Sequence, residues 1–284
     1  MILVTGATGH LGQAVIEQLL TKIPASGIAA LVRNPAKAES LKAKGISIRE
    51  GDYHNKAALV AAMQGVDKLL FISSSDFNDR PGQQRNVVDA AKEAGVKHIF
   101  YTSVSMKNAG NSAIGWLMAD HFATEDYIKA SGLTYTFLQN GLYMEVLPMF
   151  LGEKVFETGV FFAAGEGKTA LVSRLDLAEV AANLLTGSGH ENKAYSLAGS
   201  HAYSFADVAN YLSAQSGKTV AYTDAPADVF ENVLKGAGLP DHVVVMSTGF
   251  AAAMKNGDFD NAGSTLEQLL GRAPRSLSEF LKHT

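Results

Sequence analysis

Three glycines near the start of the chain have the spacing of a phosphate-binding turn. Gly6, Gly9 and Gly12 follow an apolar run at residues 2–4 and precede apolar residues at helical spacing. This order predicts a strand, a tight turn and a helix whose N-terminal N–H groups attract phosphate. The first glycine allows the bend, the second lets the main chain approach a pyrophosphate, and the third permits close helix packing. The expected dinucleotide-binding residues of this turn are Gly6, Ala7, Thr8, Gly9, His10 and Leu11.

Residues after the later strands should bind the rest of the nucleotide, because ligands of open parallel sheets lie at the carboxyl ends of the strands. Arg33 follows the second predicted strand, where an acidic residue would bind the ribose 2′-hydroxyl of NAD. A guanidinium there can bind a 2′-phosphate instead, so we expect NADP(H) as the cofactor. The alternative is a surface arginine beside a turn. Asp52 has two open interpretations, a contact with the adenine or a cap on the next helix.

Small or polar residues after the fourth and sixth predicted strands are expected to contact the nicotinamide half. They are Ser73, Ser74, Ser75, Asn140, Gly141, Leu142 and Tyr143. A serine-rich loop without a ligand is the alternative for the first three. Tyr101 ends the fifth predicted strand, where a hydroxyl would lie beside the reacting carbon, and it is a candidate catalytic residue.

The residues that would transfer a proton are unusual. Hydride reduction of a ketone needs an acid within hydrogen-bond reach of the oxygen, commonly a tyrosine with a lysine four residues later. None of the nine tyrosines has that lysine. On a helix predicted at 118–130, His121 stands where the tyrosine would be, and Glu125 shares its face. We expect His121 to be catalytic, donating a hydrogen bond to an acceptor oxygen, and Glu125 to be solvated helix surface. No third ligand completes a metal site.

The elements that must position these residues alternate regularly in the first part of the chain. Short β-rich runs separated by helical periods imply parallel strands joined by right-handed crossovers. The predicted strands are 2–4, 28–32, 46–48, 68–72, 98–101 and 135–138, and the predicted helices between them are 36–44, 57–63, 83–93 and 118–130. The sequence therefore predicts an α/β fold with a Rossmann-type, doubly wound parallel sheet.

The second part of the chain is less regular and predicts a smaller α+β C-terminal lobe. Strands are expected at 159–163, 170–172, 194–197 and 219–222, with helices at 174–185 and 205–215. We divide the chain into a nucleotide-binding domain at 1–187 and a substrate-side lobe at 188–284, with part of 141–165 assignable to either.

Composition restricts the partners. The 284 residues are 47% hydrophobic and carry a net charge of −4, which gives no electrostatic reason to expect nucleic acid or an anionic membrane surface. No cysteine is present, and no apolar run approaches the ~18 residues of a membrane span. The first predicted strand leaves no room for a signal peptide. We expect a cytoplasmic protein, either a monomer or a homodimer, that binds a small aromatic or quinone-like acceptor.

Several runs together resemble the NmrA-like branch of the atypical short-chain dehydrogenases. They are Val4-Thr5-Gly6-Ala7-Thr8-Gly9-x-Leu11-Gly12, Leu31-Val32-Arg33-Asn34-Pro35-x-Lys37, Gly51-Asp52-Tyr53, Lys68-Leu69-Leu70-Phe71-Ile72-Ser73, Ala94-Gly95-Val96-Lys97-His98-Ile99, His121-x-x-Thr124-Glu125 and Phe137-Leu138-x-Asn140-Gly141-x-Tyr143. The resemblance covers essentially the whole chain. It implies a Rossmann lobe, a small C-terminal lobe, NADPH in the cleft between them, and quinone-like or conjugated cationic acceptors.

Such acceptors suit a chain without the tyrosine–lysine pair. A quinone is already electrophilic, and water can protonate its reduced oxygens. The protein then needs to hold the acceptor against the nicotinamide and exclude bulk water. Candidate walls are Tyr101, Trp116, His121, Tyr143 and Phe150, although Phe150 is better explained as a core residue. One alternative is a non-catalytic NADP(H)-binding redox sensor. A sugar-nucleotide epimerase is disfavoured, because that chemistry needs the tyrosine base.

Overall fold

The computed structural model describes residues 1–282 and divides the chain into two compact units. The first unit comprises Met1–Val104, Asp120–Asn140 and Arg174–Ser196, and the second comprises Ser105–Ala119, Gly141–Ser173 and the chain from Leu197 onward. The units therefore alternate along the sequence. The predicted boundary between residues 187 and 188, as a limit of separately folding domains, stays a prediction.

A seven-stranded sheet forms the centre of the first unit. Its strands are β1 (Ile2–Val4), β2 (Ile28–Val32), β3 (Ser47–Glu50), β4 (Lys68–Phe71), β5 (His98–Val104), β6 (Thr134–Asn140) and β8 (Lys193–Leu197). They lie in the order β3-β2-β1-β4-β5-β6-β8. The pairs among the first six strands are parallel. The strand order reverses between β1 and β4, which is where ligands of doubly wound sheets bind. The predicted Rossmann-type α/β fold is confirmed.

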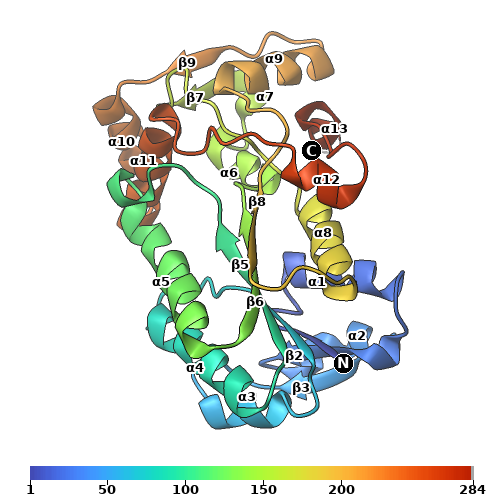
Figure 1. Cartoon of the computed structure of the whole chain (residues 1–284). Coiled ribbons are helices and arrows are strands. Elements are labelled where there is room, and N and C mark those ends of the chain that lie inside the picture. Colours follow the sequence, from blue (N-terminus) through green and yellow to red (C-terminus); the bar gives the residue numbers. More distant parts are fainter. Residues whose placement is uncertain (283–284) are drawn as a thin grey trace. The chain divides into compact units, whose positions relative to one another are not determined.

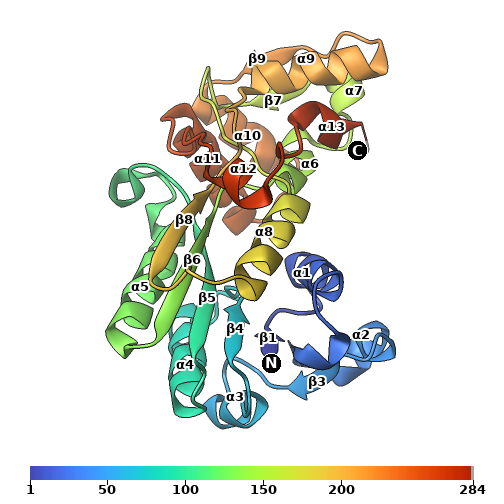
Figure 2. The same cartoon turned by 45° about the vertical axis from the view of Figure 1, so that its right-hand side comes forward.

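Helices cover both faces of this sheet (Figures 1 and 2). The helices are α1 (His10–Leu20), α2 (Glu39–Ala43), α3 (Lys56–Ala62), α4 (Arg80–Glu93), α5 (Gly115–Ser131) and α8 (Arg174–Thr186). Leu59 of α3, Val87 of α4 and Ile128 of α5 pack with Phe71 and Phe137 of the sheet in one buried cluster. Both views show α1 and α8 side by side away from these three helices. Crossover connections place the helices in this way, as the alternating sequence pattern predicts.

The second unit contains a small parallel pair of strands and several helices. The strands are β7 (Val160–Phe162) and β9 (Tyr222–Asp224). The helices that lie within it are α6 (Leu147–Leu151), α7 (Val155–Thr158), α9 (Phe205–Ser216), α10 (Ala227–Gly236), α11 (Asp241–Lys255), α12 (Thr265–Leu270) and α13 (Leu277–Leu281). Phe150, Phe162, Phe205 and Phe250 form an aromatic cluster with ring centroids 4.4 to 6.5 Å apart. This packing supports the interpretation of Phe150 as a core residue.

Some predicted elements differ from the observed ones. Residues 170–172 form no strand, because only an isolated bridge pairs Val172 with Tyr143. The predicted strand 219–222 lies instead at Tyr222–Asp224. Helix α4 begins at Arg80, three residues before the predicted start, because the Asp79 side chain accepts a hydrogen bond from Gly82 and Pro81 stands in the first turn. No helix within residues 1–282 has the length and apolar character needed to cross a membrane.

Candidate functional site

A cavity of about 320 Å³ lies at the carboxyl ends of β1, β2, β3 and β4. It is lined by Gly6, Thr8, Gly9, Leu31, Val32, Arg33, Gly51, Asp52, Tyr53, Ile72, Ser73, Ser74, Ser75, Asp76 and Gln83. Seven of the residues predicted to bind the dinucleotide are therefore brought together from three segments distant in sequence. Ala7, His10 and Leu11 do not line the cavity. Ala7 is fully buried, whereas His10 is exposed and opens α1.

The glycine loop, residues 5–9, has the geometry that a phosphate needs. Gly6 has φ +57°, a conformation that favours glycine, and its oxygen accepts a hydrogen bond from the Gly9 N–H at 2.9 Å. Gly9 is the N-cap of α1, and no side chain caps this helix. The first turn of α1 also carries no acidic residue. The first-turn N–H groups and the positive end of the helix dipole therefore meet no carboxylate, so the loop fits a dinucleotide pyrophosphate.

Arg33 is exposed at the rim of this cavity and forms no ion pair within residues 1–282. Asn34 accepts a hydrogen bond from the Ala36 N–H, which fixes the turn directly after it. This turn fixes the main chain that carries Arg33, and the exposed guanidinium remains available to an anion. Asp52 does not cap α3, because the Asn55 side chain does so by accepting from the Ala58 N–H at 3.1 Å. The interpretation of Asp52 as a contact of the adenine stays open.

Tyr53 was not among the predicted site residues, yet it supports the floor of the cavity. Its hydroxyl donates to the Ile72 carbonyl at 2.9 Å and also contacts the Thr5 hydroxyl. Thr5 Oγ1 in turn accepts from the Ile72 N–H at 2.9 Å. Burial raises the pKa of Tyr53 well above its usual value, so the phenol stays protonated. These three residues tie the ends of β1, β3 and β4 together beneath the glycine loop.

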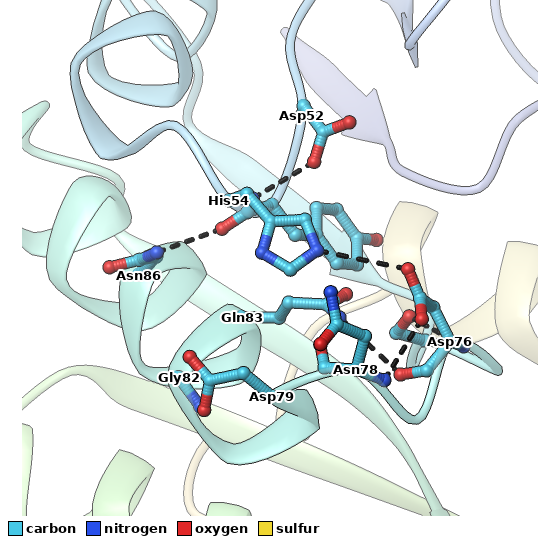
Figure 3. A network of polar contacts seen from close by, with 10 residues as sticks. Asp52, His54, Asp76, Asn78, Asp79, Gly82, Gln83 and Asn86 are labelled. Carbon is cyan, nitrogen blue, oxygen red and sulfur yellow. Dashed lines mark hydrogen bonds and ion pairs between the residues drawn. The ribbon is translucent and has the colours of Figure 1, made fainter.

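The serine loop, residues 73–79, is held by a second set of contacts at the cavity rim (Figure 3). Its contacts involve Asp76, which lies 3.7 Å from His54, and Gln83, whose amide donates to the Asn78 carbonyl at 2.6 Å. Asp52 accepts from the His54 N–H, and Asn86 donates to the Tyr53 carbonyl. The ends of β3 and β4 are therefore both anchored near the start of α4.

The predicted catalytic pair, His121 and Tyr101, lies together in the first unit. The Tyr101 hydroxyl is 3.2 Å from His121 Nδ1 and 2.7 Å from Gln84 Oε1. On its other side, His121 Nε2 is 2.8 Å from Nη2 of Arg80, which also lies 3.0 Å from Ser73 Oγ. Both ring nitrogens of His121 therefore have protein partners. Burial raises the pKa of Tyr101 to about 12, and burial together with the Arg80 charge lowers the pKa of His121 to about 3.

Sequence reasoning missed Arg80 and Gln84, the two α4 residues that complete this network. Arg80 follows the N-cap Asp79, and the Asp-Arg-Pro run at 79–81 is the signal of a helix start. Gln84 lies one turn later and therefore on the same side of the helix. The predicted start at residue 83 left Arg80 in a loop, where it could not be placed beside Gln84.

Glu125 corrects one prediction. It is not solvated helix surface, because its side chain is only 6% exposed and accepts a hydrogen bond from Gln139 at 2.9 Å. The sequence spacing correctly placed it one turn after His121, but it did not reveal that this face of α5 packs against β6. No group of three or more candidate metal ligands occurs within the described part of the chain.

The predicted nicotinamide contacts after β6 fall in two units. Asn140 ends β6 in the first unit and is buried. Gly141 belongs to the second unit, where its N–H donates to the Leu197 carbonyl at 3.0 Å. Leu142 accepts from the Val172 N–H, and Tyr143 pairs with Val172 in an isolated bridge. Their predicted role in cofactor binding stays a prediction, as does that of the exposed Trp116 as an acceptor wall.

Known proteins resemble this chain over its full length. It is 45% identical over 285 residues to quinone oxidoreductase 2 of Escherichia coli, covering 100% of this chain and 98% of that protein. It is 34% identical over 287 residues to an NAD(P)H azoreductase of Xenophilus azovorans, covering 99% and 97% of the two chains.

Solved structures agree with these relationships. The E. coli NADPH-dependent quinone oxidoreductase in complex with NADPH superposes with a TM-score of 0.91 at 44% identity, covering 100% of this chain and 99% of that one. The triphenylmethane reductase of Citrobacter sp. in complex with NADP(H) gives a TM-score of 0.92 at 38% identity, with the same coverage. The model of the NmrA-like family matches residues 1–281. The chain therefore belongs to the NmrA-like family.

Proposed function

We propose that this protein is an NADPH-dependent oxidoreductase that transfers a hydride to a quinone or a similar conjugated acceptor. The observation that carries the proposal is the cavity in which a glycine loop, Arg33 and the serine loop meet at the reversal point of the sheet. The relatives support it, since they include a quinone oxidoreductase, an azoreductase and a triphenylmethane reductase, which act on conjugated or aromatic compounds.

The residues that would hold the cofactor follow from the geometry. The glycine loop and the start of α1 would bind the pyrophosphate, with Gly6 and Gly9 on the cavity wall. Arg33 would bind the 2′-phosphate through its guanidinium. Ser73, Ser74 and Ser75 would contact the nicotinamide half, since they line the cavity at the end of β4.

When bound, NADPH supplies the hydride. The chain's own residues keep the reacting groups in place and restrict water, which lowers the barrier mainly by orientation. The buried Tyr101 and the neutral His121 do not line the cavity themselves but form an ordered network behind Ser73, which does. The acceptor gains two electrons and one proton's equivalent as the hydride and takes a second proton from water, and both hydrogens end on the two oxygens of the hydroquinone. A hydride received at a ring carbon reaches this state by tautomerisation, which restores the aromatic ring. The reaction thus consumes one NADPH and one proton for each quinone reduced to a hydroquinone.

A spectroscopic assay tests the proposal. Oxidation of NADPH, followed by its near-ultraviolet absorbance, should accelerate when the purified protein meets quinones or triarylmethane dyes. NADH in place of NADPH should give a much lower kcat/KM, because it offers Arg33 no phosphate. NADPH that binds tightly in calorimetry but is never consumed across the acceptor panel would favour the alternative of a redox sensor.

Several finer properties remain proposals. A small aromatic or quinone-like acceptor is the expected partner, and the oligomeric state is expected to be monomeric or dimeric. The expected cytoplasmic location and the lack of a nucleic-acid partner stay predictions from composition.

A further inference from the structure

Arg80 joins the wall of the cavity to the predicted catalytic histidine. Its side chain is only 6% exposed, and one nitrogen, Nη2, lies within hydrogen-bond distance of both Ser73 Oγ and His121 Nε2. The guanidinium carbon also stands 5.8 Å from the centre of the Phe77 ring. The side chain is therefore held between the serine loop and α5, and its fork of donors has little freedom to turn.

This contact decides where the imidazole proton lies. A guanidinium keeps its protons in a protein and can only donate, so His121 Nε2 must be unprotonated to accept from it. A neutral ring then carries its proton on Nδ1, which faces the Tyr101 hydroxyl. Burial and the nearby charge of Arg80 hold the pKa of His121 at about 3 against a smaller opposing effect of the Thr102 main chain, so the ring is neutral in ordinary buffers.

The tautomer of His121 determines the direction of the next hydrogen bond in the network. The Tyr101 oxygen accepts from His121 Nδ1, so its own proton goes to Gln84 Oε1 at 2.7 Å. Thr124 Oγ1 lies 2.6 Å from the same amide oxygen, whereas the buried Gln84 Nε2 has no hydrogen-bond partner among residues 1–282.

The hydrogen bond from Arg80 also fixes the direction of the Ser73 hydroxyl proton. Ser73 Oγ accepts from Arg80, which directs its own hydroxyl proton away from the guanidinium. Ser73 lines the cavity, and the other protein acceptor near its Oγ is the Tyr101 hydroxyl at 3.5 Å, so a bound ligand competes for the proton only with this long contact. An Oγ that accepts from a cation is also a stronger donor, because hydrogen bonds in a chain polarise one another.

We propose that Arg80 is a positioning residue that fixes His121 as the neutral Nδ1-protonated tautomer and makes Ser73 the hydrogen-bond donor to the ligand. The assignment to a ligand rests on the proposed function, whereas the tautomer does not. In this arrangement neither His121 nor Tyr101 gives a proton to the reduced acceptor. In this proposal the hydrogen bond from Ser73 to the ligand replaces the one expected from His121 to an acceptor oxygen.

Nitrogen-15 NMR of the histidine rings in the full chain tests the tautomer without any substrate. The His121 signals, assigned with His121→Gln, should show an unprotonated Nε2 and a protonated Nδ1. In Arg80→Met the Nε2 signal should move toward the protonated range and the pKa of His121 should rise, while Arg80→Lys should give an intermediate result. Arg85→Met, an exposed arginine on the same helix, is the matched control and should change neither property. A protonated Nε2 in the unaltered protein, or no response to Arg80→Met, would overturn the tautomer assignment.

A double-mutant cycle tests the role of Ser73. Ser73→Ala and Arg80→Met should each lower kcat/KM for a quinone roughly tenfold to a hundredfold, the effect of losing a hydrogen bond to a charged group. The double variant should lose little more than either single variant, because both changes remove the same directed proton. Circular dichroism and NADPH calorimetry establish that each variant is folded. Fully additive losses in kcat/KM would overturn the coupling between Ser73 and Arg80. If the unaltered protein reduces no quinone, the proposed function is rejected, whereas the NMR result on the tautomer still holds.

Discussion

Gly12 lies so close to the main-chain oxygen of Gly6 that an added Cβ atom would stand 2.3 Å from that oxygen. The same Cβ would stand 2.9 Å from the Ala7 Cα. Both contacts involve main chain, which cannot turn aside as a flexible side chain does. The third glycine of the fingerprint therefore lets α1 pack against the glycine loop itself, and the position of that loop depends on it.

Gly12→Ala should therefore displace the glycine loop. We expect a loss of about 1–3 kcal/mol in unfolding free energy from overpacking, together with a clear loss of NADPH affinity. Gly236→Ala is the matched control, since a Cβ on this α10 residue would meet nothing within 4 Å and alanine favours a helix. Urea denaturation and calorimetry measure the two effects. Unchanged NADPH affinity in a destabilised Gly12→Ala would separate loop packing from cofactor binding.

Arg33→Asp should change cofactor preference rather than folding. The exposed guanidinium forms no ion pair within residues 1–282, so its loss should leave the melting temperature nearly unchanged. The NADPH affinity should fall roughly tenfold to a hundredfold, because a charge-assisted hydrogen bond contributes about 1.5–3 kcal/mol. The NADH affinity should change far less. Calorimetry with both nucleotides is the measurement, and equal losses for the two would assign Arg33 a structural role.

Tyr53→Phe should destabilise the protein and weaken cofactor binding together. The change removes the donor to the Ile72 carbonyl and a partner of the fully buried Thr5 hydroxyl. Leaving such groups unsatisfied costs about 1–3 kcal/mol in unfolding free energy. Thr5→Val removes the shared contact with Tyr53 and the acceptor of the Ile72 N–H, so the double variant should be less destabilised than the sum of the two. Strict additivity in urea denaturation would show that the three residues do not act as one unit.

The sequence predicted the nucleotide half of the site because its signals are local. Gly6, Gly9 and Arg33 owe their positions to a strand end and a turn, which residue type and spacing reveal directly. The strand bounds were reproduced for β1 and β2 and shifted by a few residues in the other strands of the sheet. Regular alternation was enough to predict the sheet, since right-handed crossovers leave few topologies for such a pattern.

The network behind the serine loop could not be predicted because its partners are distant in sequence. Arg80 and His121 are 41 positions apart, and Gln84 and Thr124 are 40 apart. A polar residue on a helix reads as solvated surface until the packing of that face is known, which is why Glu125 was placed wrongly. Asp79 and Pro81 indicate the early start of α4, but the sequence does not show that Arg80 then contacts Ser73 and His121, because that depends on how α4 packs in the fold.

The pH profile of quinone reduction should lack any ionisation of His121 or Tyr101 near neutrality. The pKa of His121 is lowered to about 3 and that of Tyr101 is raised to about 12, so neither group titrates between about pH 5 and pH 9. Tyr101→Phe and His121→Gln should therefore change the rate without changing the shape of the profile over this range. A kcat/KM inflection near pH 6.5 that disappears in His121→Gln would assign the histidine a titrating role.

The same depressed pKa makes the folded state sensitive to acid. In the unfolded chain His121 takes up a proton near its ordinary pKa of about 6.5, whereas in the folded protein it stays neutral down to about pH 3. Unfolding is therefore accompanied by proton uptake within this window, so the stabilising contribution is fully present above pH 6.5 and is lost as the pH falls. The unfolding free energy then changes with pH by up to about 1.4 kcal/mol per pH unit.

His121→Gln tests this effect, because glutamine cannot titrate but retains an amide oxygen to accept from Arg80. Urea denaturation from pH 7 to pH 4 should thus show the unaltered protein losing up to roughly 3 kcal/mol more than His121→Gln. Parallel loss in the two proteins would mean that His121 is solvated and charged in the fold, which the contact with Arg80 forbids.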